Sequence, residues 1–299
     1  MSEKIAEAEE CIKKAEKYLK TSVLSLKFKP DFDSAASAYE RAAVCYKNAR
    51  KLKESRDAYL KAAENHENND IIFHAAKCRE QAALLCRDLG DKEQAKSLML
   101  QASQQYAETG TPETSAQALD KAGKFFETDD PETAIEVYQK AYQVVSETDR
   151  TRQATQFLEK LIKLHLKLEK YDEAARLLAQ EIDMYMELKE ASKVGRLTSA
   201  LAVVHLKRGD SVEANKHFRN SFRCDGFAQT EDAITLSSLI SAFETGDSEK
   251  FQKCVNQPHM KSLDNEFLRI LKKLEPPKVE KAEGDGGTQG QEEDEVDLK

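Results

Sequence analysis

A small residue returns at a nearly constant interval along the first half of the chain. In each copy a bulky or long side chain stands three positions before an alanine; these alanines are Ala42, Ala62, Ala82, Ala102, Ala122 and Ala141. The steps between them are 20, 20, 20, 20 and 19 residues, and fainter copies follow at 158–161 and 178–181. Twenty residues form one helix of about four turns plus a short connection. Each period therefore predicts one helix, and two periods predict an antiparallel hairpin.

Alanine at a fixed phase suits helices that pack side by side, because a side chain of this size lets the two backbones approach closely. Hairpins of about 40 residues in series are typical of α-solenoids and close to the tetratricopeptide repeat (TPR) class. The Trp and the fixed Gly-Tyr spacing of the strict TPR consensus are missing. The pattern predicts an all-α, TPR-like α-solenoid of antiparallel helical hairpins capped by a C-terminal helical bundle.

Glycine and proline mark the helix ends. Each of four glycines, at 90, 110, 209 and 246, precedes an Asp or Thr that can cap the next helix, and Pro112 and Pro131 fit a first helical position. We expect about fourteen helices, at 3–21, 31–50, 53–67, 70–89, 91–108, 112–127, 131–147, 149–168, 171–188, 190–208, 211–223, 229–245, 247–256 and 260–274.

The repeat fades after Glu181, and the helices predicted beyond residues 224–227 are shorter. We expect a twisted solenoid over 1–225 and a helical bundle over 226–274. Pro276 and Pro277 end the last helix, and the segment that follows is rich in glycine and acidic residues. The sequence predicts a disordered acidic tail over 275–299.

Composition narrows the classes of function. The chain has 299 residues, 33% of them charged, with a formal net charge of −8. Nine acidic and three basic residues place −6 of this charge in 275–299, which leaves −2 for the body; neither part is basic enough to predict a nucleic-acid partner. No apolar run of about 18 residues and no signal-peptide pattern occur, so we expect a cytoplasmic protein. The six cysteines form no C-x-x-C pair and are expected to be reduced and structural.

Patterns for catalysis, cofactors or metals are weak. Neither a phosphate-binding loop nor an H-E-x-x-H motif occurs. His74 lies four residues before Cys78 on one helix face, a spacing that could hold a metal or form a Cys–His nucleophile. A Cys in an alanine-rich packing stripe beside a half-buried His is ordinary, and we favour that interpretation. We expect no enzyme, no catalytic residue, no metal and no cofactor.

Two segments are better candidates for contact with partners. Residues 21–32 form a predicted loop flanked by lysines, and its apolar residues are Val23, Leu24, Leu26 and Phe28. Such a loop suits contact with a membrane surface or a partner, and packing onto the first helical hairpin is the alternative. At the C-terminus, Val296 and Leu298 interrupt an acidic run, which suits a tail that enters a basic site on a partner.

Several stretches resemble a known family: AEKYLK at 15–20, KPDFDSAA at 29–36, GTPET at 110–114 and DPETA at 130–134. They are similar to the soluble NSF attachment protein (SNAP) family, most of all to its gamma form, over nearly all of the body; the ending EVDLK is similar to the tail of the alpha form. The resemblance implies a twisted solenoid with a terminal helical bundle. It also implies an adaptor that binds SNARE complexes, which are syntaxin-containing four-helix bundles.

The same resemblance implies a partner ATPase and a location. The adaptor recruits the hexameric AAA ATPase NSF and stimulates SNARE disassembly in vesicle fusion, intracellular protein transport and ER–Golgi transport. It lies peripherally on vesicle and organelle membranes. The alternative is a TPR-like scaffold for other peptide or helical partners, unrelated to SNAREs. Recovery of neither NSF nor SNARE complexes in a pull-down from cytosol would favour that alternative.

The resemblance assigns roles to individual residues. The membrane-contacting loop corresponds to 21–32, although the phenylalanines of the alpha form are mostly replaced here. Two SNARE-facing lysines of the alpha form correspond to Gln117 and Gln156, so positive charge for SNARE binding is expected instead from Lys121, Arg150, Arg152 and Lys160. The ATPase-binding and ATPase-stimulating positions correspond to Glu244, Asp247, Glu249, Asp297 and Leu298.

Overall fold

The computed structural model describes residues 2–21, 28–148 and 151–277. Over these ranges it contains fifteen α-helices and no β-strand, which confirms the predicted all-α fold. Eleven of the helices succeed one another along the chain: α1 (Ser2–Leu19), α2 (Phe32–Asn48), α3 (Leu52–Asn68), α4 (Ile72–Asp88), α5 (Lys92–Glu108), α6 (Pro112–Phe126), α7 (Pro131–Ser146), α8 (Thr151–Lys167), α9 (Tyr171–Glu187), α10 (Ala191–Lys207) and α11 (Ser211–Ser221).

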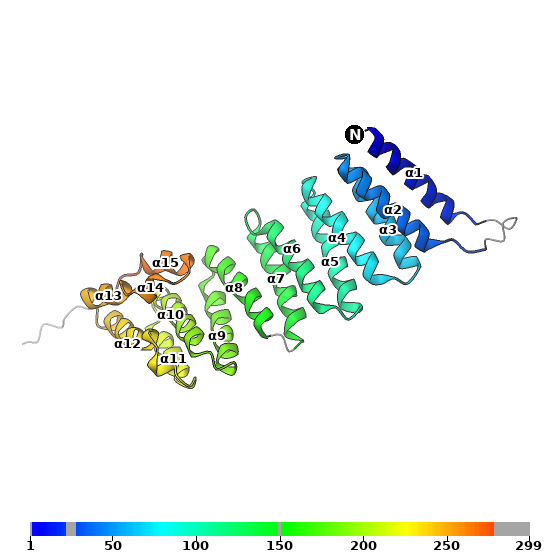
Figure 1. The fold of residues 1–299 in the computed structure, drawn as a ribbon. Helices are drawn as coiled ribbons and strands as arrows, with labels where there is room; N and C mark the ends of the chain where they lie inside the picture. Colours follow the sequence, from blue (N-terminus) through cyan, green and yellow to red (C-terminus); the bar gives the residue numbers. More distant parts are fainter. Residues whose placement is uncertain (1, 22–27, 149–150, 278–299) are drawn as a thin grey trace, which may run out of the picture.

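These helices form an elongated row of antiparallel rods, with α1 at one end (Figure 1). A short 3₁₀ helix, η1 (Phe227–Gln229), leads to the last four helices: α12 (Glu231–Glu244), α13 (Ser248–Val255), α14 (Pro258–Lys261) and α15 (Asn265–Leu271). Helices α12–α15 lie together at the end of the molecule far from α1 (Figure 1). There α12 and α15 pack against α10, and α15 also contacts α8.

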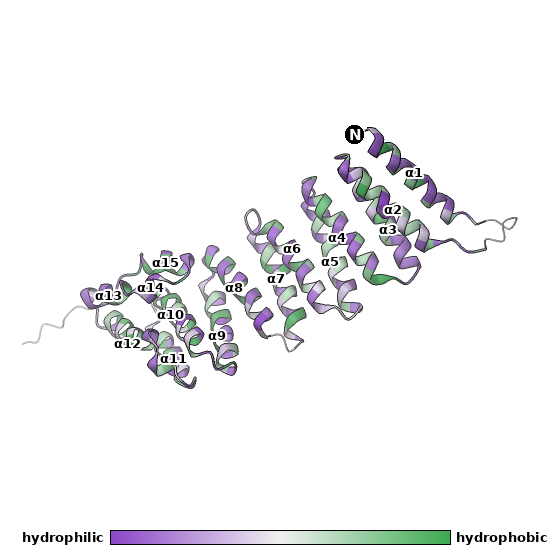
Figure 2. Ribbon diagram, viewed as in Figure 1, coloured by the Kyte–Doolittle hydropathy of each residue, from purple (hydrophilic) through white to green (hydrophobic). Residues whose placement is uncertain are grey.

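The repeated alanines lie where the prediction requires them. Ala42, Ala62, Ala82, Ala102, Ala122 and Ala141 are all fully buried. The next residue is also small and buried in the first five copies: Ala43, Ala63, Ala83, Ser103 and Gly123. Figure 2 shows apolar and polar residues interleaved along the helices, as expected when each helix buries a stripe against its neighbours. Close backbone approach at these small residues sets the spacing of the row.

Helix boundaries follow the predicted punctuation. Asp91 and Asp210 each accept a hydrogen bond from the backbone N–H three residues on, at 3.1 and 2.9 Å. Gly90 and Gly209 precede them with φ of 83° and 76°, in the left-handed region that glycine tolerates. Four turns reach the same region without glycine, at Arg50, Asp70, Glu169 and Lys189. A left-handed conformation is strained for such side chains, so the packing of the flanking helices holds these turns in place.

One predicted helix is wrong. Residues 260–274 were expected to form a single helix, but α14 ends at Lys261 and α15 begins at Asn265. Asp264 between them has extended backbone angles, φ −61° and ψ 152°. Its carboxylate forms ion pairs with Lys163 of α8 and Arg196 of α10. Tertiary contacts therefore interrupt a segment whose local pattern favours a continuous helix.

No helix within the described ranges is both long enough and apolar enough to cross a membrane.

Gly123→Ala should destabilise the protein by about 1–3 kcal/mol, the usual range for overpacking a core. A Cβ atom at Gly123 would lie 2.5–2.9 Å from three ring atoms of Tyr138, which is fully buried. In an exposed helix interior the same change stabilises by about 1 kcal/mol, so the sign of the effect tests the close approach. Chemical denaturation measures it, with Gln117→Ala on the exposed side of α6 as control. A raised free energy of unfolding for Gly123→Ala would contradict the packing described here.

Candidate functional site

From α3 to α9, polar contacts join helices that are two positions apart in the row. Among the even-numbered helices, Glu80 of α4 pairs with Lys121 of α6 at 2.5 Å, and Asp120 of α6 pairs with Lys160 of α8. We call these two pairs the even-helix ladder. Odd-numbered helices are joined in the same way; examples are Lys96–Glu136 at 3.1 Å and Tyr142–Gln180 at 2.6 Å. The partners lie 38 to 41 residues apart, which is the length of one hairpin.

The even-helix ladder contains two of the four cationic residues expected at a SNARE surface. Lys121 and Lys160 are on neighbouring even-numbered helices, and both have an acidic partner within the chain. Arg152, also on α8, lies 3.4 Å from Glu190, and its side chain remains 82% exposed. The fourth residue, Arg150, lies outside the described residues. Of the three that are described, Arg152 is the most accessible to a partner.

The pair between Asp120 and Lys160 is partly shielded from water. Burial opposes ionisation of the Asp120 carboxyl, but hydrogen bonds from Lys124 and Lys160 outweigh it and lower its pKa. The Lys160 ammonium also lies 5.0 Å from the centre of the Tyr138 ring and 5.7 Å from that of Phe157. Lys160 is therefore held by its own solenoid, and much of its charge is compensated before any partner binds.

Gln117 and Gln156 are both exposed, one on α6 and one on α8. They lie on the same even-numbered helices as the ladder. The structure thus leaves two accessible neutral amides at positions where the resemblance expects lysines in the alpha form.

The acidic residues expected to meet the ATPase come together at the turn between α12 and α13. Glu244 is the last residue of α12, Asp247 caps α13 by accepting a hydrogen bond from the Lys250 N–H at 2.9 Å, and Glu249 follows in its first turn. All three are exposed. A carboxylate at the negative end of a helix dipole is unfavourable by about 0.3–1 kcal/mol, so Glu244 is not explained by the stability of its own helix.

The expected membrane loop is described only in part. Phe28 is 68% exposed, as contact with a surface requires. Val23, Leu24 and Leu26 lie outside the described residues, as do Asp297 and Leu298 of the predicted tail. Helix α1 and the α12–α13 turn lie toward opposite ends of the row (Figure 1).

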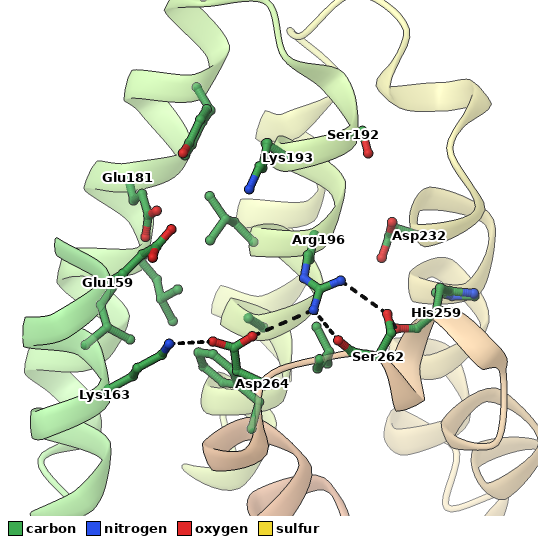
Figure 3. Close-up of a pocket in the computed structure, with 17 residues that line it drawn as sticks. Glu159, Lys163, Glu181, Ser192, Lys193, Arg196, Asp232, His259, Ser262 and Asp264 are labelled. Atoms are coloured by element: carbon green, nitrogen blue, oxygen red, sulfur yellow. Dashed lines mark hydrogen bonds and ion pairs between the residues drawn. The ribbon is translucent and has the colours of Figure 1, made fainter. Parts of the chain in front are cut away.

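A cavity of about 570 Å³ lies where the last helices pack onto the row. Its walls come from α8, α9 and α10 on one side and from α12, α14 and α15 on the other. Figure 3 shows that Lys163, Arg196, Ser262 and Asp264 bridge its lower part. Lys163 lies 2.8 Å from Asp264, and Arg196 donates to the Ser262 hydroxyl at 3.2 Å and to its carbonyl. The hydrogen bond from Lys163 lowers the pKa of Asp264, so this cluster joins the terminal helices to the row through ionised groups.

Glu181 lines the same cavity without a partner (Figure 3). It is 1% exposed, and neither carboxyl oxygen has a hydrogen-bond partner among the described residues. Burial, with a smaller contribution from Glu159, raises the pKa of this carboxyl to about 8. The side chain is therefore mostly protonated at neutral pH.

Sequence reasoning missed Glu181, although a signal existed. It occupies the position that carries alanine in the earlier periods, and this phase is buried in the copies from Ala42 to Ala141. A carboxyl at a buried phase predicts a shifted pKa. The Lys163–Asp264–Arg196 cluster had no comparable signal, because its members lie far apart in the chain.

Comparison with known proteins places this arrangement in a family. The model of the family described as "Soluble NSF attachment protein, SNAP" matches residues 6–275. The chain belongs to the soluble NSF attachment protein family. The match spans the row of helices and the terminal helices α12–α15, and it supports an adaptor role related to SNAREs and NSF in general.

Curated members of the SNAP family resemble the chain over most of its length. A gamma-soluble NSF attachment protein from Dictyostelium discoideum is 25% identical over 91% of this chain and 84% of its own length. One from Arabidopsis thaliana is 24% identical over 90% of this chain and 92% of its own. The expected similarity to the gamma form of the SNAP family is thus confirmed.

Solved structures give a more distant likeness. Aspartyl phosphate phosphatase F from Bacillus subtilis is 15% identical, with 91% of this chain and 72% of that chain covered and a TM-score of 0.39. Similarity at this level is too low to indicate a function.

Glu181→Gln should stabilise the protein at alkaline pH and change little in acid. The unfolded carboxyl ionises near 4.5 and the folded one near 8, so the stability of the native sequence falls as pH rises through this window. A tenfold change in an acid dissociation constant corresponds to about 1.4 kcal/mol, so the variant should gain up to roughly 5 kcal/mol at about pH 9. Urea denaturation across pH measures the difference.

Glu187→Gln provides the matched control, because Glu187 lies on the same helix and is exposed. As a substitution at an exposed position, it should change the free energy of unfolding by no more than about 0.5 kcal/mol. A Glu181→Gln effect of equal size in acid and alkali would contradict the raised pKa.

Proposed function

We propose that the chain is a non-catalytic adaptor that binds SNARE complexes and recruits and stimulates NSF for SNARE disassembly. The observation that carries the proposal is the family match over residues 6–275, which includes both the solenoid row and the terminal helices. An extended row of helices suits a rod-shaped partner, because successive hairpins can contact successive parts of it. In the proposal, the disassembly acts in vesicle fusion and intracellular protein transport.

We assign the SNARE-binding surface to the even-numbered helices α6 and α8, which bear all the described cationic residues expected there. Lys121 and Lys160 are already paired with Glu80 and Asp120, so they offer little unbalanced charge. Arg152 offers more, because its side chain is 82% exposed. Exposed polar contacts of this kind are individually weak and sensitive to salt, which suits repeated binding and release.

We assign NSF binding to the α12–α13 turn and the acidic tail. Glu244, Asp247 and Glu249 are exposed and adjacent, and Glu244 lies where its charge disfavours its own helix. A basic surface on a partner would relieve that repulsion. Leu298, near the C-terminus, is assigned the stimulation of ATP hydrolysis on the strength of the family resemblance alone.

We assign membrane contact to the connection between α1 and α2. Phe28 is 68% exposed and is followed by Lys29, a combination that suits an interface between lipid and water. One short apolar loop binds a bilayer only weakly, so engagement of a membrane-anchored SNARE complex would strengthen the contact. A peripheral location on vesicle and organelle membranes from the cytoplasmic side follows from this assignment.

Arg152→Glu should weaken capture of purified SNARE complex about fivefold, which corresponds to about 1 kcal/mol for an exposed charge. Its matched control is Lys140→Glu: Lys140 has the same phase in the repeat as Lys121 and Lys160 but lies exposed on the odd-numbered helix α7. Titration of SNARE complex against each variant at low and moderate salt measures the effect. Equal losses in the two variants would show that the even-numbered helices are not the binding surface.

Leu298→Ala should lower SNAP-stimulated ATP hydrolysis by NSF while leaving NSF recruitment nearly intact. The reason is that recruitment is assigned to the separate acidic turn between α12 and α13. A coupled ATPase assay and a pull-down on immobilised SNARE complex measure the two quantities, and Glu292→Ala in the same predicted tail serves as control. Unchanged hydrolysis in Leu298→Ala would refute the assignment of the tail.

Replacing Leu24 and Phe28 by serine should reduce flotation of the chain with liposomes that carry anionic lipid. The two changes remove apolar area that would enter the interface and leave the flanking lysines in place. Leu188→Ser and Phe222→Ser, which alter exposed apolar residues elsewhere, provide the control. Equal flotation of the native and doubly substituted chains would exclude the loop from membrane binding.

A further inference from the structure

Three side chains of metal-ligand type converge near the α1 end of the row. They are Glu40 of α2, His66 of α3 and Cys78 of α4, one from each of three consecutive helices. One ligand atom from each lies within 4.8 Å of the other two. The Glu40 Oε1 and His66 Nε2 atoms are 2.7 Å apart.

The cluster is buried on one side and open on the other. Cys78 is 2% exposed and His66 is 4% exposed, whereas 37% of the Glu40 side chain is accessible. An ion could therefore enter past Glu40 and reach the imidazole and the thiol. Nδ1 of His66 has no hydrogen-bond partner among the described residues. The Glu40 carboxylate beside Nε2 favours the tautomer that carries the proton there, so Nε2 becomes available as a ligand when that proton moves to Nδ1.

The repeat shows what is unusual about Glu40. Glu40, Glu80 and Asp120 occupy the same phase of α2, α4 and α6. Glu80 is balanced by Lys121 and Asp120 by Lys160, each from the next even-numbered helix. The equivalent position for Glu40 is Gln81, which is neutral. Where the next two carboxylates meet a lysine, Glu40 meets His66 and Cys78.

We propose that Glu40, His66 and Cys78 bind a zinc ion, with a water molecule as the fourth ligand. Zinc accepts thiolate, imidazole and carboxylate together in a tetrahedron with metal–ligand distances of about 2.0–2.3 Å. Ligand atoms in such a tetrahedron are about 3.3–3.8 Å apart. Small side-chain rotations bring the three donors, now within 4.8 Å of one another, to that spacing. The ion replaces the lysine that balances the carboxylate elsewhere in the even-helix ladder.

Two protons move when the ion binds. Burial, together with the charge of Glu40, raises the pKa of the Cys78 thiol to about 12, so the metal-free thiol is protonated. Zinc displaces that proton to solvent and binds the thiolate. The proton that His66 Nε2 donates to Glu40 in the metal-free state moves to Nδ1, and Nε2 then binds the ion. The two positive charges of zinc then balance the thiolate and the Glu40 carboxylate.

Cobalt(II) is the probe, because it substitutes for zinc in such sites and its absorption spectrum reports thiolate coordination. Titrating the reduced full-length chain with cobalt(II) should give a thiolate-to-cobalt charge-transfer band in the near ultraviolet and the visible bands of a tetrahedral site. Zinc should abolish both. Cys78→Ser should lose the charge-transfer band, whereas Cys86→Ser should retain it. Cys86 is the matched control, because it is fully buried on the same helix, eight residues further on.

Glu40→Gln is the second variant, in case Cys78→Ser does not fold. Its side chain is nearly the same size and partly exposed, so the fold should persist, as circular dichroism will show. Cobalt and zinc should bind it at least tenfold more weakly. The proposal is overturned if no charge-transfer band appears, if cobalt binds only through exposed carboxylates, if the band survives in Cys78→Ser, or if Cys86→Ser loses it equally.

Discussion

Close contact between helix backbones at the repeated alanines is the constraint on which the rest of the molecule depends. A larger side chain at Ala82 or Ala122 would separate neighbouring helices, and every later helix would shift with them. Since the spacing is uniform, residues one hairpin apart come into register. The contacts between Glu80 and Lys121 and between Asp120 and Lys160 exist because of this register. Packing at the core thus determines which charges meet at the surface.

This register has a direct effect on recognition. A lysine counted from sequence as a binding residue is partly neutralised when the repeat places an acid beside it, as at Lys121 and Lys160. Positive charge that a partner can reach then comes from residues outside the even-helix ladder, such as Arg152, whose side chain is largely exposed. The α12–α13 turn differs, because its carboxylates include Glu244 at an unfavourable helix end. Surfaces of the two kinds occur at separate places in the molecule (Figure 1).

The helices and most of their ends could be predicted from sequence, because periodicity, caps and glycines are local signals. The break at Asp264 could not, since it depends on Lys163 and Arg196, which are distant in the chain. The resemblance nominated individual candidate residues, but their pairing within the chain could not be predicted, because it depends on the register between hairpins. The Cys78 neighbourhood shows the same limit: spacing pointed only to His74, for which we favoured ordinary packing, whereas the structure brings His66 and Glu40 from two other helices.

The polar contacts between helices two positions apart also have a mechanical consequence. When a row of rods bends, contacts lengthen along one edge and shorten along the other. Here polar pairs join the even-numbered helices to one another and the odd-numbered helices to one another, and the more exposed of them, such as Lys96–Glu136, are worth about 1 kcal/mol or less. Curvature can thus change by small increments while the alanine contacts between adjacent rods persist. A load applied at the α13 end would spread along the row as gradual flexing, without a single hinge.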